Sequence, residues 1–178
     1  MKDFTADEIR ALLAELADRL DRAGIAASIL VLGGSAIALH APARGSTRDI
    51  DAVLRPRGPI LAVAHEMAVE HGLPSAWLSD GVVDTLHGID LGTDTTTTVA
   101  AAGRVHIAVA STELLLALKA TTTRDSETDL DDAVRLAAAL GATTESAVEA
   151  IVRRFIPGVP GSLELRFERI AALAAARG

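Results

Sequence analysis

The 178-residue sequence predicts an α+β fold, with a small mixed β-sheet followed by a helical C-terminal half. Short apolar segments bounded by glycines or polar loops, which are typical of strands, all lie before residue 111. After residue 111, apolar residues recur at helical spacing behind Ser or Thr residues that can act as N-caps. We therefore expect a core domain over residues 1–110, with an N-terminal helix and the mixed sheet, and a helical region over residues 111–178 packed on it.

The expected elements follow one another without an internal repeat. They are a helix over 5–23, a strand over 26–32, a short helix over 36–41, a strand over 49–54, a helix over 59–71, a hairpin of strands over 96–101 and 104–109, and helices over 112–123, 129–140, 145–155 and 162–176. The first helix has Leu and Ile residues at helical spacing and ends at Gly24, whereas the largely apolar run over 26–32 indicates a buried strand. Gly33-Gly34-Ser35 predicts a tight turn into the short helix, which Pro42 stops.

The later elements depend on turn and capping residues. The strand over 49–54 follows a polar loop, and the helix after it is closed by Gly72. Gly103 separates the two strands of the hairpin. The residues that predict the N-termini of three C-terminal helices are Ser111, Thr128 and Thr144. Residues 73–95, which include Trp77, are expected to be irregular.

The composition excludes several classes of protein. A formal net charge of −7 argues against nonspecific coating of nucleic acid, and 2% aromatic residues with no Tyr argue against a base-stacking platform. The absence of Cys excludes disulfides and thiolate metal sites. No apolar run reaches the ~18 residues of a membrane span. The N-terminus begins an acidic amphipathic helix rather than a signal peptide, so we expect a cytoplasmic protein with no membrane partner.

Asp49 and Asp51 are the first candidates for chemistry. Residues i and i+2 of a strand point to the same face, so the two carboxylates should project together. Like charges this close repel unless a cation lies between them, and Mg²⁺ is often held by one or two carboxylates together with substrate phosphates. The alternative is a solvated Asp pair at the entrance to a strand, which is the commoner explanation of an isolated D-x-D pattern.

The Gly33-Gly34-Ser35 turn is the second candidate. Where a turn opens a helix, backbone N–H groups and the helix dipole favour a phosphate, and Ser35 can add a hydroxyl donor. The alternative is an ordinary tight turn. A nucleoside triphosphate needs both anion donors and a metal ion, so this turn, lying shortly before the D-x-D strand, indicates an NTP site.

Two sequence blocks resemble a known superfamily. The segment LGGSAIALHAPARGSTRDIDAVL is similar to the first motif of the DNA polymerase β-like nucleotidyltransferases, in which a Gly-Gly/Ser turn precedes a D-x-D strand. Within that superfamily it is most similar to the AbiEii/MenT-type toxins of bacterial toxin–antitoxin pairs. The segment VASTELLLALKATTTRDSETDLDDAVRLAAALG resembles their later block, a Leu-Leu-Ala-x-Lys helix followed by a basic residue and a D-x-x-D helix. WLSD at 77–80 matches an element of one branch, and the resemblance covers residues 29–156.

The resemblance implies roles for individual residues. Those implied to bind the nucleotide are Gly33, Gly34, Ser35, Arg48, Lys119 and Asp129. Those implied to be catalytic are Asp49, Asp51, Lys119 and Asp132, with Asp49 and Asp51 ligating Mg²⁺ or Mn²⁺.

Several of these residues also have simpler explanations. Acids in a first turn stabilise the helix dipole, which would account for Asp129 and Asp132, and Thr128 with Asp131 resembles a capping box. Lys119 fits a solvated lysine on an amphipathic helix. Two further basic residues, Arg48 and Arg124, are either phosphate or RNA contacts or surface charges.

One departure from the superfamily pattern concerns the metal site. These enzymes usually carry a third carboxylate on a following strand, and residues 104–109 contain none. The candidates to replace it are Asp80, Asp84, Asp90 and Asp94, with Asp80 preferred. Without a replacement, the enzyme would use one well-held metal ion or have weak activity. The five His residues form no zinc-binding pattern, and His40 is expected to be a packed or surface residue rather than a substrate contact.

The resemblance implies an enzyme that transfers a nucleoside monophosphate from an NTP to an acceptor, with the tRNA 3′ end as the expected acceptor. Its partner would be a cognate antitoxin. Two alternatives stay open: a nucleotidyltransferase-fold protein that has lost catalysis and acts as a binding module, and a small-molecule nucleotidyltransferase of the antibiotic-modifying kind. Metal-dependent NTP binding would distinguish the two enzymes from the module.

Overall fold

The computed structural model describes residues 3–41, 46–122 and 126–177. It contains a five-stranded mixed sheet and a helical C-terminal half, so the predicted α+β class is confirmed. Two compact units make up the chain: a sheet unit, Met1–His87 with Thr96–Ala110, and a helical unit, Gly88–Thr95 with Ser111–Gly178. Pro42 and Arg124, which the sequence singled out, lie outside the described residues.

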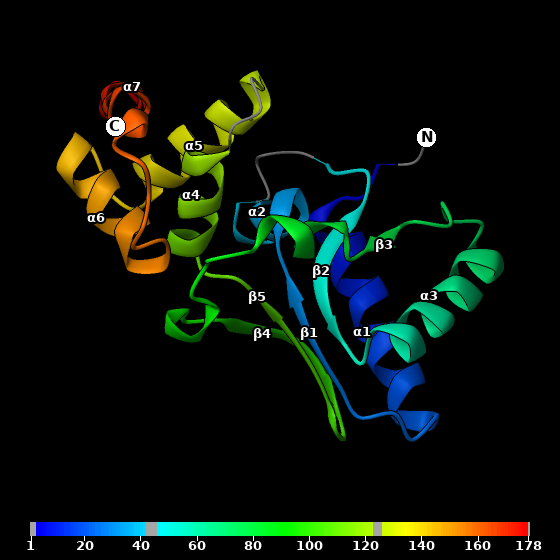
Figure 1. The fold of residues 1–178 in the computed structure, drawn as a ribbon. Helices are drawn as coiled ribbons and strands as arrows, with labels where there is room; N and C mark the ends of the chain where they lie inside the picture. Colours follow the sequence, from blue (N-terminus) through cyan, green and yellow to red (C-terminus); the bar gives the residue numbers. More distant parts are fainter. Residues whose placement is uncertain (1–2, 42–45, 123–125, 178) are drawn as a thin grey trace. The chain divides into compact units, whose positions relative to one another are not determined.

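The sheet has the strand order β3-β2-β1-β5-β4 (Figure 1). Its strands are β1 Ala27–Val31, β2 Ile50–Arg55, β3 Leu78–Ser79, β4 Thr97–Ala102 and β5 Val105–Val109. The central strand β1 pairs antiparallel with β2 and parallel with β5. The edge strand β3 runs parallel to β2, and β4 runs antiparallel to β5 as the expected hairpin.

Only one face of the three central strands is buried along its whole length. Its buried side chains alternate along the three central strands: Ala27, Ile29, Val31, Ile50, Ala52, Leu54, Val105, Ile107 and Val109. The alternate side chains, which form the open face, are half-buried or exposed: Ser28, Leu30, Asp51, Val53, Arg55, His106 and Ala108. The expectation that β1 is a buried strand holds for one face only, because exposed Ser28 and half-buried Leu30 lie on the other.

The α-helices of the sheet unit, within the part of the chain that the structure describes, are α1 Ala6–Arg22, α2 Gly33–His40 and α3 Arg57–His71. A capping box starts α1, because the Glu8 N–H donates to Thr5 Oγ1 (3.3 Å) and the Thr5 N–H donates to Glu8 Oε2 (2.9 Å). Ile9, Leu13, Leu16 and Leu20 of the apolar stripe are completely buried. Helix α1 packs against the sheet and α3 (Figure 1). The stripe that predicted this helix from the sequence thus anchors the buried face.

Trp77 anchors the segment that the sequence left irregular. Its side chain is completely buried, and its Nε1–H donates to the Ala64 carbonyl of α3 (2.8 Å). The Trp77 carbonyl accepts from the Ile50 N–H (2.7 Å), which starts the pairing of β3 with β2. Two short 3₁₀ helices follow, η2 Gly81–Thr85 and η3 Leu91–Thr93.

Within its described residues, the helical unit consists of η3, four α-helices and a second 3₁₀ helix. The latter are α4 Thr112–Thr121, α5 Glu127–Ala139, α6 Glu145–Phe155, η4 Gly161–Leu163 and α7 Glu164–Ala175. Ser111 and Thr144 cap α4 and α6 as predicted. The prediction for α5 is wrong, because Ser126 is its N-cap and Thr128 lies inside the first turn.

Asp131 does not complete a capping box in α5, contrary to the simpler explanation of this segment. Its carboxylate instead binds Arg135 one turn later (2.7 Å) and Arg177 near the end of the chain. Hydrogen bonds from these two guanidinium groups lower the pKa of Asp131. Among the described residues, no helix combines the length and apolarity needed to cross a membrane.

Candidate functional site

The Asp51 side chain lies against the first residue of α2. The Leu32 N–H donates to the Asp51 carbonyl (2.8 Å), and the next residue, Gly33, begins α2. A Cβ atom at Gly33 would lie 2.9 Å from Asp51 Oδ2, so the carboxylate is directly beside the Gly33 Cα. Gly33 also has φ of 61°, a left-handed conformation that favours glycine. The position suits a carboxylate, because the N-terminal end of a helix carries partial positive charge.

The glycines belong to the helix rather than to a turn before it. α2 begins at Gly33, so the expected turn over 33–35 and helix start at 36 are wrong. The first N–H groups of a helix have no partner within it and are the usual donors to a bound anion. Gly34, which is half-buried, makes a further interaction. The local geometry therefore brings a carboxylate to the anion-favouring end of α2.

Ser35 is turned away from this surface. Its side chain is 1% exposed, and its Oγ–H donates to the Leu32 carbonyl (2.9 Å). The hydroxyl thus closes the first turn from inside, where a triphosphate cannot reach it. At the other end of α2, the His40 ring bonds through Nε2 to the Ala110 carbonyl (2.7 Å), as expected for a packing residue.

Asp49 precedes β2 by one residue and is exposed. Ile50 between the two acids is completely buried, which is consistent with Asp49 and Asp51 lying on the same side of the extended backbone. Within the described residues, the Asp49 carboxylate makes no hydrogen bond or ion pair. Arg48 is also exposed, and its Nε lies 3.9 Å from Asp3 Oδ1, a distant surface pair.

No third carboxylate joins this pair among the described residues. Asp80, the preferred candidate, lies one residue beyond the partner of Asp51 in β3, but Arg57 Nε and Nη2 both bind its carboxylate. Hydrogen bonding to Arg57 lowers the pKa of Asp80, as in a structural ion pair. Of the other candidates, Asp84 lies in exposed η2, and the Asp90 and Asp94 carboxylates accept from the backbone N–H groups of Gly92 (2.9 Å) and Ser111 (3.2 Å).

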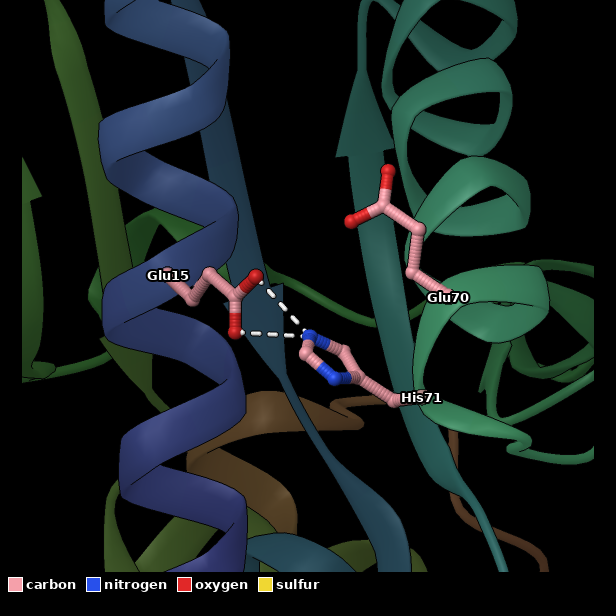
Figure 2. Close-up of side chains that lie close together, drawn as sticks. All are labelled: Glu15, Glu70 and His71. Atoms are coloured by element: carbon pink, nitrogen blue, oxygen red, sulfur yellow. Dashed lines mark hydrogen bonds and ion pairs between the residues drawn. The ribbon is translucent and has the colours of Figure 1, made fainter.

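A group of possible metal ligands that the sequence did not indicate lies between α1 and α3. Figure 2 shows Glu15 of α1 facing Glu70 and His71 of α3, and the ligand atoms of these three residues lie within 4.8 Å of one another. His71 Nε2 lies 2.9 Å and 3.0 Å from the two Glu15 oxygens. The Arg19 guanidinium binds both Glu15 (2.6 Å) and Glu70 (2.5 Å). Because Arg19 already supplies a cation between the carboxylates, the group is explained as an ion-pair network joining two helices.

The network lowers the pKa of its acids. Hydrogen bonding from His71, with that from Arg19, lowers the pKa of Glu15, and the hydrogen bond from Arg19 lowers the pKa of Glu70. Both glutamates in turn raise the pKa of Arg19. Glu15 and His71 are 56 residues apart, so no local pattern in the sequence could have paired them.

In the helical unit, Lys119 of α4 reaches two acids of α5. Its Nζ donates to Asp129 Oδ1 and lies 3.1 Å from Asp132 Oδ2. The two acids are 5% and 2% exposed, and each makes a further interaction. The explanation of Lys119 as a solvated surface lysine is wrong, because its side chain is only 15% exposed. The ammonium group instead neutralises buried negative charge between α4 and α5.

The predicted site residues thus form two groups, one in each unit. Asp49, Asp51 and Gly33 belong to the sheet unit, and Lys119, Asp129 and Asp132 belong to the helical unit.

Comparisons with known proteins assign no family to the chain. No family model, no curated protein and no solved structure matches it. The likeness to the polymerase β-like toxins therefore rests on the sequence blocks quoted above.

Proposed function

We propose that the chain is a metal-dependent nucleotidyltransferase, which moves a nucleoside monophosphate from an NTP to an acceptor hydroxyl. The observation that carries the proposal is the Asp51 carboxylate held beside Gly33 at the start of α2. A potential metal ligand and the anion-favouring end of a helix meet there within one side-chain length. A triphosphate with its divalent cation needs both features at one place.

Asp49 and Asp51 are the residues that would hold the cation. Carboxylate oxygens are the hard donors that Mg²⁺ and Mn²⁺ take, and no ion pair engages Asp49 among the described residues. The absent side chain of Gly33 supports this fit, since a Cβ there would meet the Asp51 carboxylate. A bound cation would neutralise charge on the triphosphate during transfer.

The chain's own groups would bind and orient the reactants. N–H groups at the start of α2 hold triphosphate oxygens in this scheme. The acceptor oxygen then forms a bond to the α-phosphorus, the bond from that phosphorus to the leaving oxygen breaks, and pyrophosphate departs. The proton of the acceptor hydroxyl passes to a carboxylate or to water. Ser35 takes no part, because its hydroxyl is committed to Leu32.

The acceptor and the cellular role are proposed from the resemblance alone. On that basis the acceptor is RNA, specifically the tRNA 3′ end, and the protein is a cytoplasmic toxin neutralised by a cognate antitoxin. A small-molecule acceptor is the alternative within the same chemistry.

One observation favours a different class of function. Within the described residues Asp49 and Asp51 have no third carboxylate beside them, and Ser35 is not available to a ligand. A nucleotidyltransferase-fold protein that has lost catalysis and acts as a binding module would account for both facts. Failure of the folded protein to bind NTP in the presence of Mg²⁺ is the result that this alternative expects.

The test is transfer of label from each of the four α-³²P NTPs, with Mg²⁺ or Mn²⁺, onto total RNA, onto protein and onto an aminoglycoside. We compare the wild type with Asp51→Asn and Asp49→Asn. The matched control is Asp18→Asn, which removes an exposed acid from α1. Labelled RNA that disappears in the first two variants but persists in the control supports the proposal. No label on RNA, protein or an aminoglycoside, from folded protein free of antitoxin, contradicts it.

A further inference from the structure

The open face carries a row of exposed side chains, three of them polar, at the end of the sheet away from Asp51. The register aligns Arg55 of β2 with Ser28 of β1, and Ser28 with His106 of β5. Ala101 of β4 continues the row beside His106. Residues paired across strands point to the same face, so these side chains lie next to one another at intervals of about 4.8 Å. All four are exposed.

This row is basic in an acidic protein. The chain has a formal net charge of −7, but Asp51 is the only acid among the outward side chains of β1, β2 and β5 that define the open face. Arg104, one residue before β5, adds a second guanidinium group next to the row, tethered to the Gly24 carbonyl (3.0 Å). Neither Arg55 nor His106 makes an ion pair within the described residues, so both remain available to an anion.

The row and the Asp51 end are joined by a short apolar shelf. Val53, Leu30 and Ala108 are aligned across the three strands, and all three are half-buried. Arg55 follows Asp51 by four residues, which in a strand corresponds to about 13 Å. A stacked nucleic-acid strand rises ~3.4 Å per nucleotide, so this distance corresponds to about four nucleotides.

We propose that the row Arg55–Ser28–His106 on the open face binds the phosphate backbone of a single-stranded RNA acceptor, a few nucleotides before the 3′ hydroxyl. This inference rests on the proposed function, because it takes the Asp51 end of the same face as the place of transfer. A polyanion complements two guanidinium groups and an imidazole. An RNA strand bound there has to cross the apolar shelf to present its 3′ end at Asp51. With no aromatic residue on the face, binding depends on phosphates and is sensitive to salt and tolerant of base sequence.

The experiment measures binding of a short fluorescein-labelled single-stranded RNA by anisotropy, over a salt series, to the wild type and to Arg55→Gln/His106→Ala. The matched control is Arg22→Gln, which removes an exposed arginine from α1. A second variant, Arg55→Lys, keeps the charge and should retain binding. Each lost phosphate contact reduces the magnitude of the slope of log K against log salt by about 0.7. Near 0.15 M salt this corresponds to about fourfold weaker RNA binding. We expect about tenfold weaker binding by the double variant and no change in the control.

Two results would overturn the inference. One is RNA affinity and salt slope in the folded double variant that match those of the control. The other is an equal loss of ATP binding, measured by competition, which would assign the row to the triphosphate rather than to the acceptor. Asp51→Asn separates this inference from the proposed function, since it should abolish label transfer and leave RNA binding intact. If the wild type transfers no label but its RNA binding still depends on Arg55 and His106, the binding surface holds and the enzyme proposal fails.

Discussion

Replacement of Gly33 by alanine tests whether the Asp51 position serves metal binding. The new Cβ meets two penalties, a φ of 61° and an approach of 2.9 Å to Asp51 Oδ2. Gly24 offers a matched control, because its φ is 72° and a Cβ there meets nothing within 4 Å. A left-handed conformation costs an L-residue about 1–2 kcal/mol, so both alanine variants should lose that much stability. For a chain of this size that is a fall in Tm of about 2–8 °C.

The two variants should differ in metal affinity. In Gly33→Ala the Asp51 carboxylate must rotate away from the new Cβ, which removes a ligand from its position. Loss of ligand orientation typically weakens metal binding about 10–100-fold. Calorimetric titration with Mn²⁺ measures this, alongside urea unfolding followed by circular dichroism. Equal Mn²⁺ affinity in Gly33→Ala and Gly24→Ala would refute the reasoning, whatever their stabilities.

Three further predictions concern stability. Lys119→Met leaves two buried carboxylates without their ammonium partner and should cost about 3–5 kcal/mol of unfolding free energy, measured in urea; a loss below about 1 kcal/mol would contradict a buried ion pair. Ser111→Ala removes the hydroxyl that accepts the Leu114 N–H (3.0 Å) and should cost about 0.5–2 kcal/mol, with Thr in its place retaining most of the stability. The pKa of Glu15 in the folded chain lies below its ordinary value of 4.5, so its contribution to stability is present above that pH and is lost as the pH falls through the lowered pKa. Thermal unfolding of Glu15→Gln should therefore lose less stability between neutral and acidic pH than the wild type, and parallel pH profiles would oppose this assignment.

Features set by a few neighbouring residues could be predicted from the sequence. The caps at Ser111 and Thr144 were correct because each side chain accepts from an N–H only three residues away. For α5 the predicted cap was wrong, because the hydroxyl that accepts from the Asp129 N–H belongs to Ser126, two residues before Thr128. The predicted start of α2 is also wrong. From the sequence, Gly33 is interpreted as a turn residue, whereas in the structure it begins the helix, and the Asp51 carboxylate beside it leaves no room for a side chain.

Features set by distant partners could not be predicted. β3 is two residues long, too short to leave a pattern, and exists because β2 and the burial of Trp77 hold it in place. The sequence favours Asp80 as the third carboxylate, but in the structure its carboxylate binds Arg57, which lies 23 residues earlier in the chain. The D-x-D pair itself was recognisable, but its relation to the start of α2 depends on the antiparallel register of β1 and β2.

The buried Trp77 gives the protein a built-in optical probe for one unit. It is the only tryptophan, the chain has no tyrosine, and Trp77 belongs to the sheet unit. Its indole is sealed from water and hydrogen-bonded to Ala64, so native emission should be blue-shifted and should move to longer wavelength when that core opens. Far-ultraviolet circular dichroism reports mostly on helices, which occur in both units. If the unfolding curves followed by Trp77 fluorescence and by circular dichroism separate, the two units melt independently. The shift of each curve in a variant would then show which unit has lost stability.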